Sequence, residues 1–474
     1  MSASNVQEQS MPTVLIAGGG IGGLMLGTLF ERINIPYHIF ERASELRSLG
    51  SAMTLGANIL PVFEQLGLLD EIYKISKPCP SLDFYGPKAE KIGSIPLMGE
   101  KGTGYENLLF ARPKLYEILR SQVPTQKISL NKKVLRIEES DDCVQIHCSD
   151  GTSYKGDILV GADGAYSAVR QSLYKRMDEQ GILPKSDMEK MSIGYVTMVG
   201  VANPPNPEKY PQLKDKFTHF SQVMGEGGLG KNWTAVSVSD NQICWGLGLQ
   251  LSESQALEQQ FRNSEWGPES NDAMIKEYQD CPCPWGGTMG EIIEATPKDL
   301  ISKVFLEEKF FKTWHHGRTV LIGDACHKML PGAGLGAVNA MHDAVVLANC
   351  IYTADNMTLE GITGAFKDFY SQRYQYSYDQ FKNSGAMTRT LFGQTWMERT
   401  IRRLILNYLP NWVHQMSFAK TLSYRPQIAW LPLAENRGTV RVQPQTGKRK
   451  VIEQKLQSKA VNNADVLERP ASEK

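Results

Sequence analysis

The sequence predicts an α/β protein in which a domain with a mostly parallel sheet carries an inserted antiparallel sheet and is followed by a helical region. Three observations support this class. Near the N-terminus, a short apolar segment runs through a glycine-rich turn into a helical pattern, and a second apolar segment follows. Between residues 183 and 312, short alternating runs are typical of antiparallel strands. From residue 318 a buried strand returns, and a long helical stretch follows it.

The first apolar strand ends in three glycines at the spacing of a dinucleotide-binding motif. Gly18 permits a tight turn, Gly20 lets the backbone approach a pyrophosphate, and Gly23 lets the following helix pack against the strand. The N-terminus of that helix favours negative charge. A second strand at 35–40 ends at Glu41, where a carboxylate can accept hydrogen bonds from an adenosine ribose. Because these parts follow in order, we interpret them as a Rossmann-like dinucleotide site.

The composition is that of an ordinary globular protein, with 41% hydrophobic and 22% charged residues. The 51 basic residues balance 51 acidic ones, so we expect no nucleic-acid partner. Residues 1–11 are polar and lack the pattern of a signal peptide, so we expect a flexible N-terminus. No apolar run reaches the roughly 18 residues that a spanning helix needs. The eight cysteines form no CxxC pair, which indicates a cytoplasmic location.

Two later segments bear on the number of dinucleotide folds. A buried strand at 157–161 ends in a second glycine turn at Gly164 and returns the chain to the first domain. A further GxGxxG pattern at 225–230 lies between two apparent strands and opens no helix. We interpret it as a hairpin loop, so the chain carries one dinucleotide fold rather than two.

These patterns divide the chain into six segments. The predicted divisions are a flexible N-terminus at 1–11, a first part of the dinucleotide-binding domain at 12–182, a substrate domain at 183–312 to which 79–100 contribute, a second part of the first domain at 313–375, a helical region at 376–440 and a disordered tail at 441–474.

The segment 398–425 has two interpretations. It holds five Arg or Lys residues against one Glu, with Leu404, Leu409 and Trp412 among the interleaved apolar residues. A helix with this pattern can lie on a membrane surface. An amphipathic helix packed against the protein is the interpretation that we favour, so peripheral association with an internal membrane stays the less favoured alternative.

Three separated motifs carry a resemblance to a known family. They are the glycine turn with Glu41, the stretch from Gly161 through Asp163 and Gly164 to residue 170, and the stretch from residue 323 to residue 344. In this order and spacing they resemble the single-component FAD-dependent monooxygenases of the p-hydroxybenzoate hydroxylase-like family, also called group A. The fungal epoxidases and hydroxylases of secondary metabolism look nearest. The resemblance covers roughly residues 12 to 350, and it identifies the first domain as an FAD-binding domain.

The resemblance implies a set of FAD contacts. The helix-starting arginine matches Arg112, whose forked cation suits a pyrophosphate or ribityl oxygen. Asp324 matches the aspartate that binds the ribityl chain, and Pro331 to Ala337 would wrap the flavin ring, with a helix starting near Gly336. The implied cofactor residues are Gly18, Gly20, Gly23, Glu41, Gly50, Ala52, Arg112, Asp163, Gly164, Asp324, Pro331, Gly334, Gly336 and Ala337.

The chain departs from the family in the flavin-wrapping segment. Where many members read Gly-Gln-Gly-x-Asn, this chain has Gly334-Leu335-Gly336-Ala337-Val338, and an asparagine comes one place later, at Asn339. Backbone donors can still serve the flavin. The contacts that the family's Gln and Asn side chains make are not carried over.

Two residues are candidates for a catalytic role. Arg47 lies in the loop that resembles the family segment along the flavin, where it could guide NADPH or flavin movement; a salt bridge to Glu45 is the alternative. His327 lies beside the flavin motif and could act as a general base, although the matching position in the family is usually structural. Asp163 has two compatible interpretations: its side chain can cap the next helix, and the turn that carries it can also serve the cofactor.

The resemblance implies that NAD(P)H reduces FAD, that O2 forms a flavin C4a-hydroperoxide, and that one oxygen atom passes to an apolar or aromatic small molecule. Both hydroxylation and epoxidation fit, and the lack of an obvious base favours an alkene. An FAD oxidoreductase without oxygen insertion and a redox-silent FAD scaffold remain alternatives. The inserted domain holds five aromatic side chains that could face a substrate, at Tyr195, Phe217, Phe220, Trp233 and Trp245, and we expect most of them to belong to the core.

Overall fold

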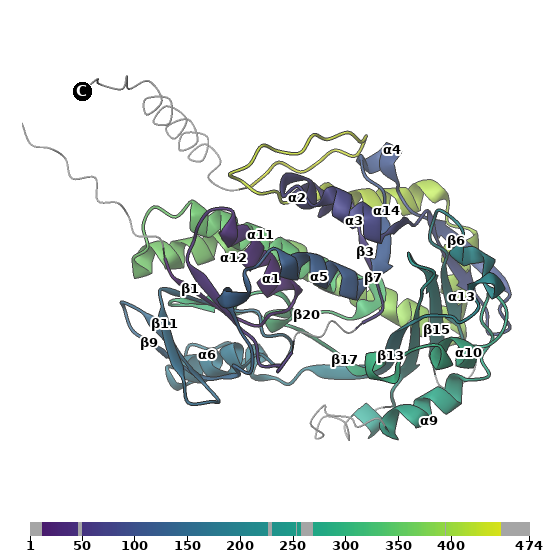
Figure 1. The fold of residues 1–474 in the computed structure, drawn as a ribbon, viewed down its shortest axis with the longest axis horizontal. Coiled ribbons are helices and arrows are strands. Elements are labelled where there is room, and N and C mark those ends of the chain that lie inside the picture. Colours follow the sequence, from purple (N-terminus) through teal and green to yellow (C-terminus); the bar gives the residue numbers. More distant parts are fainter. Residues whose placement is uncertain are drawn as a thin grey trace, which may run out of the picture.

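The computed structural model describes residues 12–45, 50–225, 230–252, 254–256, 269–393 and 395–446 (Figure 1). It confirms the α/β class: two large sheets lie side by side, and helices cover the first of them. The hydrophobic core forms one large cluster in the dinucleotide-binding part and a separate cluster under the inserted sheet.

A six-stranded sheet forms the centre of the first part. Its strands in spatial order are β18 His315–His316, β19 Thr319–Leu321, β12 Ile158–Gly161, β1 Val14–Ala17, β2 Tyr37–Phe40 and β8 Ile128–Ser129. Strand β1 pairs in parallel with both β12 and β2. Because the carboxyl ends of these strands share one edge, the turns after Ala17, Phe40 and Gly161 come together there.

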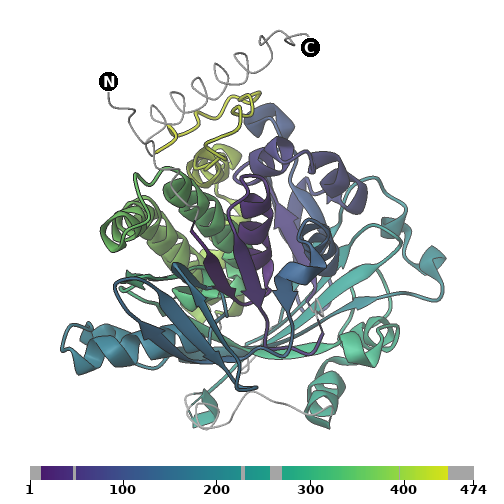
Figure 2. The same cartoon turned by 60° about the vertical axis from the view of Figure 1, so that its left-hand side comes forward.

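Helices and a small sheet enclose this central sheet. The α-helices are α1 Ile21–Glu31, α2 Leu60–Gln65, α3 Leu69–Ile75, α4 Glu100–Thr103, α5 Arg112–Ser121, α6 Ala168–Glu179, α7 Lys185–Met188, α9 Glu269–Tyr278, α10 Met289–Glu294, α11 Gly336–Tyr352, α12 Leu359–Phe392, α13 Trp396–Asn407 and α14 Asn411–Ser423. The 3-10 helices are η1 Thr125–Lys127, η2 Pro207–Lys209, η3 Pro211–Leu213, η4 Lys298–Leu300, η5 Gly323–Ala325 and η6 Pro331–Ala333. Helices α1, α5 and α11 lie side by side over the sheet (Figures 1 and 2). A three-stranded sheet of β9 Val134–Glu139, β10 Val144–Cys148 and β11 Ser153–Gly156 also packs against it.

The inserted sheet has eight strands. In spatial order they are β20 His327–Lys328, β17 Ser302–Phe310, β13 Ser192–Ala202, β16 Ile243–Gln250, β15 Lys231–Ser237, β14 Phe220–Met224, β5 Ser81–Tyr85 and β6 Lys91–Pro96. It therefore contains two strands from the 79–100 segment and one short strand from the flavin motif. Neighbouring strands are antiparallel except β14 and β5. A smaller sheet of β3 Ala52–Leu55, β7 Leu108–Ala111 and β4 Lys77–Pro78 lies between the two parts.

The second GxGxxG pattern falls between two paired strands. Strands β14 and β15 flank it and run antiparallel, and the Gly225 N–H donates to the Lys231 carbonyl at 2.8 Å. Residues 226–229 lie outside the described part of the chain. The flanking geometry is that of a hairpin, and no helix begins at Gly230.

The C-terminal region is helical as far as Ser423 and then irregular, with turns and bends. Residues 441–446, which the sequence analysis assigned to the tail, are hydrogen-bonded to the body: the Gln443 N–H donates to the Ser423 carbonyl at 2.9 Å, and Gln445 Oε1 accepts from the Gln427 N–H at 3.0 Å. The rest of the predicted tail and the predicted flexible N-terminus lie outside the described residues. Within the described ranges, no helix combines the length and apolar character needed to cross a bilayer.

The packing of the first helix generates a stability prediction. A Cβ atom on Gly23 would lie 2.1 Å from the Gly18 carbonyl oxygen, a distance that the backbone must move to relieve. We expect Gly23→Ala to lower the free energy of unfolding by about 1–3 kcal/mol, the usual cost of overpacking. Denaturant unfolding followed by circular dichroism measures this loss.

Gly364→Ala provides the matched control. Gly364 lies in α12, is exposed, and has no atom within 4 Å of the added Cβ. The same substitution there removes only the backbone entropy of a helical glycine, so stability should rise by about 0.5–1 kcal/mol. An unchanged stability of Gly23→Ala would contradict the close packing of the first turn.

Candidate functional site

A cavity of about 900 Å³ lies where the two large sheets approach each other. The turn after β1 and the N-terminus of α11 form part of its wall, and β7, α12 and α14 form other parts. Sequence-predicted residues on the wall include Gly20, Ala52, Arg112, Gly164, Asp324, Pro331, Gly334, Gly336 and Ala337. The structure therefore brings nine of the fourteen predicted cofactor residues to one space.

The glycine turn after β1 presents open backbone to this cavity. Gly18 has φ +106°, and a Cβ there would lie 2.4 Å from the Ala162 carbonyl oxygen, so only glycine fits. Gly20, in contrast, has no protein atom within 4 Å of its missing Cβ. Gly20 is also the N-cap of α1, and no side chain caps that helix. The turn thus offers a space and unpaired N–H groups to an anion, as a pyrophosphate requires.

A second open helix N-terminus faces the same cavity. Helix α11 begins at Gly336, as the sequence predicts, and Leu335 at its N-cap supplies no side-chain hydrogen bond. Gly334 before it has φ +65° and open space beside it. The backbone N–H groups of this helix end can therefore stabilise negative charge on a ring system in the cavity.

Three charged side chains line the same cavity as these two helix ends. Lys328 Nζ lies 2.6 Å from Asp324 Oδ2. Burial lowers the pKa of Lys328, but the charge and hydrogen bond of Asp324 outweigh it and raise the pKa overall. The Arg112 side chain is exposed to the cavity, which protein surrounds. Burial lowers the pKa of its guanidinium, and the charge of Asp324 offsets part of that shift. Both cations stay protonated at neutral pH and favour an anionic ligand.

Gly50 lies directly against Arg112, and Ala52 pairs with Ala111, the residue before it. The Arg112 N–H donates to the Ser51 carbonyl at 2.8 Å, and a Cβ on Gly50 would lie 3.0 Å from Arg112 Cδ. Gly50 has φ +138°, which favours glycine. Arg47, the other candidate in this loop, lies outside the described residues.

Glu41 holds the glycine turn and is not part of the cavity wall. Its carboxylate accepts the Gly19 N–H at 2.7 Å and the Ala43 N–H at 2.9 Å. In the next peptide group, the Tyr116 hydroxyl donates to the Gly19 carbonyl at 3.0 Å. A carboxylate has about four acceptor positions, so Glu41 retains capacity for a ribose hydroxyl.

Asp163 caps helix α6 and does not line the cavity, whereas its neighbours Ala162 and Gly164 do. Its Oδ2 accepts from the Ala168 and Val169 N–H groups at 2.7 and 3.2 Å. Its Oδ1 is buried and has no hydrogen-bond partner. Burial raises the pKa of this carboxyl, while the helix N–H groups act in the opposite direction.

Arg170 ties the second motif to the third. Its guanidinium donates to the Ala325 carbonyl at 2.8 Å and to the Ala165 carbonyl at 2.7 Å, and it lies 4.1 Å from the centre of the Phe311 ring. Its contacts show that it fixes the position of the turn that carries Asp324.

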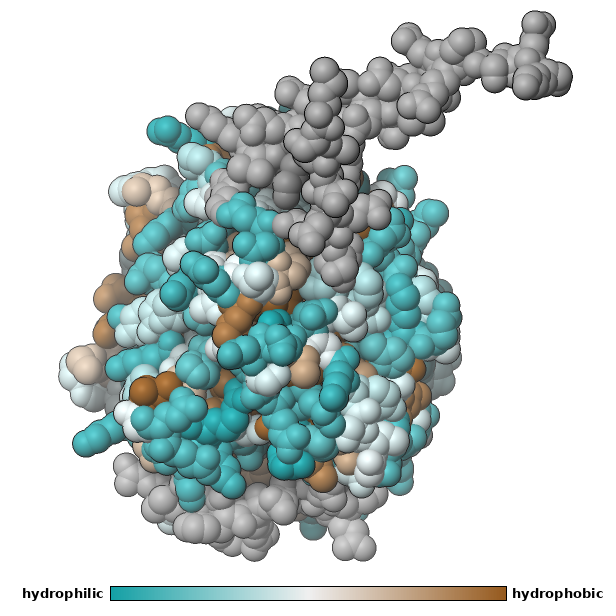
Figure 3. All heavy atoms as spheres, turned by 90° about the vertical axis from the view of Figure 1, so that its left-hand side faces the viewer, coloured by the Kyte–Doolittle hydropathy of each residue, from teal (hydrophilic) through white to brown (hydrophobic). Residues whose placement is uncertain are grey.

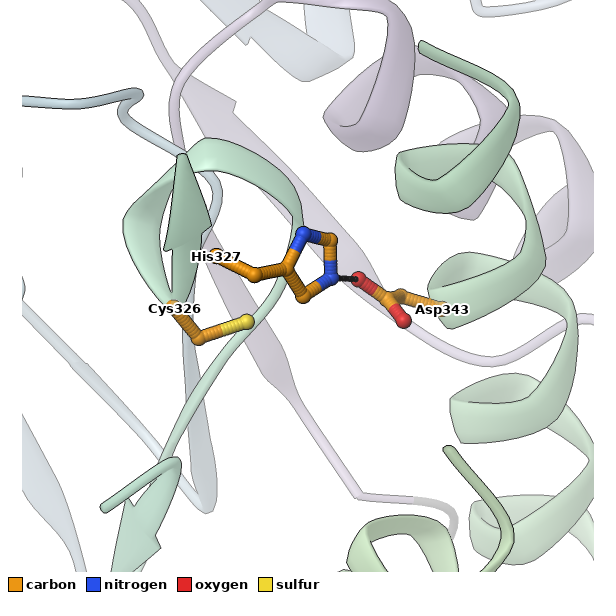
Figure 4. A group of neighbouring side chains, drawn as sticks. All are labelled: Cys326, His327 and Asp343. Atoms are coloured by element: carbon orange, nitrogen blue, oxygen red, sulfur yellow. Dashed lines mark hydrogen bonds and ion pairs between the residues drawn. The ribbon is translucent and has the colours of Figure 1, made fainter. Parts of the chain in front are cut away.

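His327 is enclosed in a buried polar cluster with Asp343 (Figure 4). Its Nε2 lies 2.6 Å from Asp343 Oδ2, which also accepts the Gly323 N–H at 2.8 Å. The other carboxylate oxygen accepts from Arg373 Nε at 2.8 Å. His327 is 1% exposed and is not on the cavity wall. A general base must reach its substrate, so this position contradicts a catalytic role for His327 and indicates a structural one.

Cys326, His327 and Asp343 place one potential metal-ligand atom each within 4.8 Å of one another (Figure 4). The charges around them oppose a cation, because Arg373 already neutralises Asp343. Burial also raises the pKa of the Cys326 thiol well above its ordinary value, which disfavours the thiolate that metals bind. The cluster therefore acts as a structural crosslink.

Asn339, the displaced asparagine of the flavin motif, belongs to the same crosslink. Its Oδ1 accepts from Arg373 Nη2 at 2.9 Å, and its amide nitrogen donates to the Leu335 carbonyl at 3.1 Å. It is 1% exposed and does not reach the cavity.

The sequence analysis missed Glu307, Tyr166 and Lys328. Glu307 lies on β17 and accepts a hydrogen bond from the Tyr166 hydroxyl. Burial raises the pKa of Glu307 to about 7, although Lys328 acts to lower it. Lys328 could have been found from its position four residues after Asp324. Glu307 and Tyr166 meet only through the tertiary fold.

The five aromatic residues proposed to face the substrate divide in the structure. Phe220 lies on the cavity wall. Trp233 and Trp245 are buried core, and their indole N–H groups donate to the Pro282 carbonyl and the Thr296 hydroxyl. Tyr195 packs on Phe392 with ring centres 4.6 Å apart, and Phe217 is exposed. One of the five therefore lies on the cavity wall, and three of the others are buried, in agreement with the expectation that most belong to the core.

Over the described residues, the fold and the cavity define a protein with one Rossmann-like dinucleotide-binding domain. Residues 11–356 match the family described as FAD binding domain, and the chain belongs to that family. The chain is similar to the FAD-dependent monooxygenase ptmM of Penicillium ochrochloron, at 30% identity over 71% of this chain and 78% of the relative. It is also similar to the FAD-dependent monooxygenase atmM of Aspergillus flavus, at 27% identity over 90% and 88% of the two chains.

Solved structures share the fold. Klebsiella pneumoniae HpxO, complexed with FAD and uric acid, superposes with a TM-score of 0.72 at 21% identity, over 89% of this chain and 99% of that one. A salicylate hydroxylase substrate complex gives a TM-score of 0.63 at 16% identity, over 88% and 98%. The chain is an FAD-dependent monooxygenase, which decides between the alternatives that the sequence left open.

The open space at Gly20 generates a binding prediction. Gly20→Ala places a methyl group in the cavity and touches no protein atom. We expect unchanged stability of the cofactor-free protein and an FAD dissociation constant raised about tenfold, for an overpacking cost of about 1–3 kcal/mol. Fluorescence titration of the apoprotein with FAD measures it. Equal affinity in the variant and the natural protein would remove Gly20 from the pyrophosphate site.

The buried cluster generates a prediction about pH. Burial raises the pKa of Asp343, but His327 and Arg373 outweigh it and lower the pKa to about 2. Asp343→Asn leaves Arg373 buried without its counter-ion, so we expect a stability loss of about 3–5 kcal/mol near pH 7. The loss is full above the unfolded-state pKa of about 4 and shrinks as the pH falls towards 2, because the natural carboxylate then also becomes protonated.

Unfolding in urea between pH 3 and 7 measures this difference. The double variant Asp343→Asn/Arg373→Met should recover part of the loss at pH 7, because it removes both charges. A loss that is the same at all pH values would show that the Asp343 charge is not its cause.

Proposed function

We propose that this FAD-dependent monooxygenase takes electrons from NAD(P)H and transfers one oxygen atom of O2 to an apolar or aromatic small molecule. The observation that carries the proposal is the division of the cavity: the charged residues lie with the two helix N-termini, and other parts of the wall carry apolar side chains with uncharged polar ones such as Asn383 among them. Bound FAD supplies the activation of O2. The residues of the chain bind the cofactor, orient the substrate and exclude water.

The polar wall supports the assignment of the cofactor residues. Gly20 and the N-terminus of α1 fit the pyrophosphate, and Arg112 with Asp324 fits the chain that joins it to the flavin ring. The N-terminus of α11 fits the pyrimidine side of that ring, where its N–H groups stabilise negative charge after reduction.

The apolar wall supports the substrate class. Its side chains come from separate elements of the fold and include Leu82, Leu97, Leu109, Phe220, Met387, Phe418 and Leu422. These groups offer few hydrogen bonds, so they select a ligand by shape and apolar surface. Packed side chains also keep water away from the oxygen that is transferred.

The titratable groups of the wall favour epoxidation over phenol hydroxylation. Among the described wall residues, the titratable side chains are Arg112, Asp324 and Lys328, and all three belong to the charged group near the helix ends. A phenol gains from a base that accepts its proton, whereas an alkene needs none. An alkene-containing substrate therefore fits best, and hydroxylation of an aromatic ring is the second candidate.

NAD(P)H is proposed as a transient reductant. The second GxGxxG pattern lies between the paired strands β14 and β15 and does not form a second dinucleotide fold. A reductant that binds, transfers its hydride and leaves needs no such fold.

The eight cysteines, all free thiols, support a reducing compartment, and we propose the cytoplasm.

Phe220 provides a test of the substrate wall, and Phe217 provides its matched control. Phe220→Ala removes a ring from the wall, so we expect KM for an apolar alkene to rise about tenfold from the lost apolar contact, with unchanged FAD content. Phe217→Ala removes an exposed ring three residues away and should change neither. Steady-state oxidation of NADPH and NADH in the presence of alkene and phenol panels measures these values.

The same reactions under O2 labelled with oxygen-18 test the activity itself. A product that carries one labelled atom, formed at the expense of NAD(P)H, is the expected result. Oxidation of NAD(P)H that yields only hydrogen peroxide with every substrate tested would contradict the proposed substrate class.

A further inference from the structure

Helices α13 and α14 expose a group of large apolar side chains that we call the apolar face. Its most exposed members are Trp396 at 75%, Tyr408 at 76%, Trp412 at 64% and Met416 at 64%. Met397, Ile401, Leu404 and Leu409 complete it. Figure 1 shows both helices on the side of the molecule away from β9 and β11. The face is concentrated: eight of the seventeen large apolar residues that are exposed in the described chain lie between residues 396 and 416.

Packing does not explain this face, because α13 turns its apolar stripe outward. Met397, Ile401 and Leu404 follow the i, i+4, i+7 spacing of one helix side, and all three are exposed. The residue that α13 buries is Arg402, whose guanidinium donates to backbone carbonyls including that of Gly393. Leu406 packs on β6, the edge strand of the inserted sheet.

Monomeric proteins rarely leave a contiguous apolar patch of this kind uncovered. The opposite side of the molecule offers a comparison. Figure 3 shows the face that carries the three-stranded sheet, and hydrophilic residues cover most of it. Exposed apolar residues on that side of the fold, such as Leu135 on β9, are separate from one another along the sequence. The apolar face is therefore the feature that needs a partner.

The charges of the two helices indicate which partner. Arg399, Arg403 and Lys420 lie at exposed or half-buried positions of α13 and α14. The acid of this segment, Glu398, bonds the Thr395 backbone and hydroxyl in the cap of α13. Cationic residues beside apolar ones suit a surface that is anionic and apolar at once. Tryptophan and tyrosine, moreover, are the side chains that gather at the boundary between lipid headgroups and acyl chains.

We propose that α13 and α14 rest on the surface of a lipid bilayer that contains anionic headgroups. Trp396, Tyr408 and Trp412 enter the headgroup region, and the basic residues contact the lipid phosphates. The structure thus supports the interpretation of 398–425 that the sequence analysis ranked second.

Docking in this way places the cavity beside the bilayer. The outward side of α14 carries Trp412 and Met416, and its inward side supplies Phe418, Thr421 and Leu422 to the cavity wall. One helix therefore separates lipid from the substrate space. An apolar substrate dissolved in the membrane then has a short path to the flavin, a consequence that rests on the proposed function.

Flotation of the full-length, FAD-loaded protein with vesicles tests the docking. The vesicles are pure phosphatidylcholine or phosphatidylcholine with phosphatidylserine. We expect binding that is stronger with phosphatidylserine and that weakens as salt rises, because screening reduces the attraction of the basic residues. The triple variant Trp396→Ser/Tyr408→Ser/Trp412→Ser should lower vesicle partitioning about tenfold or more, since aromatic burial supplies the apolar part.

Leu135→Ser/Ile182→Ser is the matched control, because it removes exposed apolar residues away from the face and should leave vesicle binding unchanged. FAD content and NAD(P)H oxidation without vesicles should be the same in all three proteins. Unchanged binding of the triple variant would overturn the proposal. A second result would also overturn it: light scattering shows a dimer of the natural protein that is lost in the triple variant, and neither protein binds vesicles. The apolar face is then covered by a second copy of the chain. Failure of oxygen transfer with intact vesicle binding would overturn the proposed function alone.

Discussion

The buried carboxylate of Asp343 determines how the flavin side of the cavity is assembled. It bonds the Gly323 N–H and His327 from the third motif and Arg373 from α12, while it belongs itself to α11. An isolated charge inside a protein is very costly, so each of these partners is required by the others. The result fixes the start of α11 and the Asp324 turn relative to one another. The backbone groups that contact the cofactor depend on this relative position of the α11 N-terminus and the Asp324 turn.

Helix α12 extends this constraint across the molecule. This helix of 34 residues contacts Asp343 through Arg373 near its middle and reaches the inserted sheet at its C-terminal end, where Phe392 packs on Tyr195. Between these points, Ser384 donates a hydrogen bond to the Leu330 carbonyl in the flavin-wrapping segment. Gly332 packs directly on Thr388 of the same helix. The polar cofactor wall and the apolar substrate wall are thus parts of one packed unit, which explains how a cavity between two sheets keeps a defined shape.

The sequence predicts the parts of the site that local backbone geometry determines. Gly18 and Gly23 are required by the packing of their own turn, Gly20 leaves space for a ligand there, and the start of α11 follows from the glycines before it. Contacts between distant segments could not be predicted in this way. His327 looks catalytic until Asp343 encloses it, and Trp233 or Trp245 looks available until the helices under the inserted sheet cover it. Helical periodicity in 398–425 likewise indicates an amphipathic helix but not which side the protein leaves uncovered.

The hydrogen bonds on both backbone groups of Gly19 have a consequence for how the cofactor binds. Glu41 and Tyr116 bond its N–H and its carbonyl before any ligand is present. The phosphate turn is therefore preorganised, and association with FAD costs little loop entropy there. Recognition of the adenosine diphosphate half becomes independent of the ring at the far end. FAD analogues with altered rings can bind the same apoprotein through their adenosine diphosphate half, so the protein is suited to cofactor replacement.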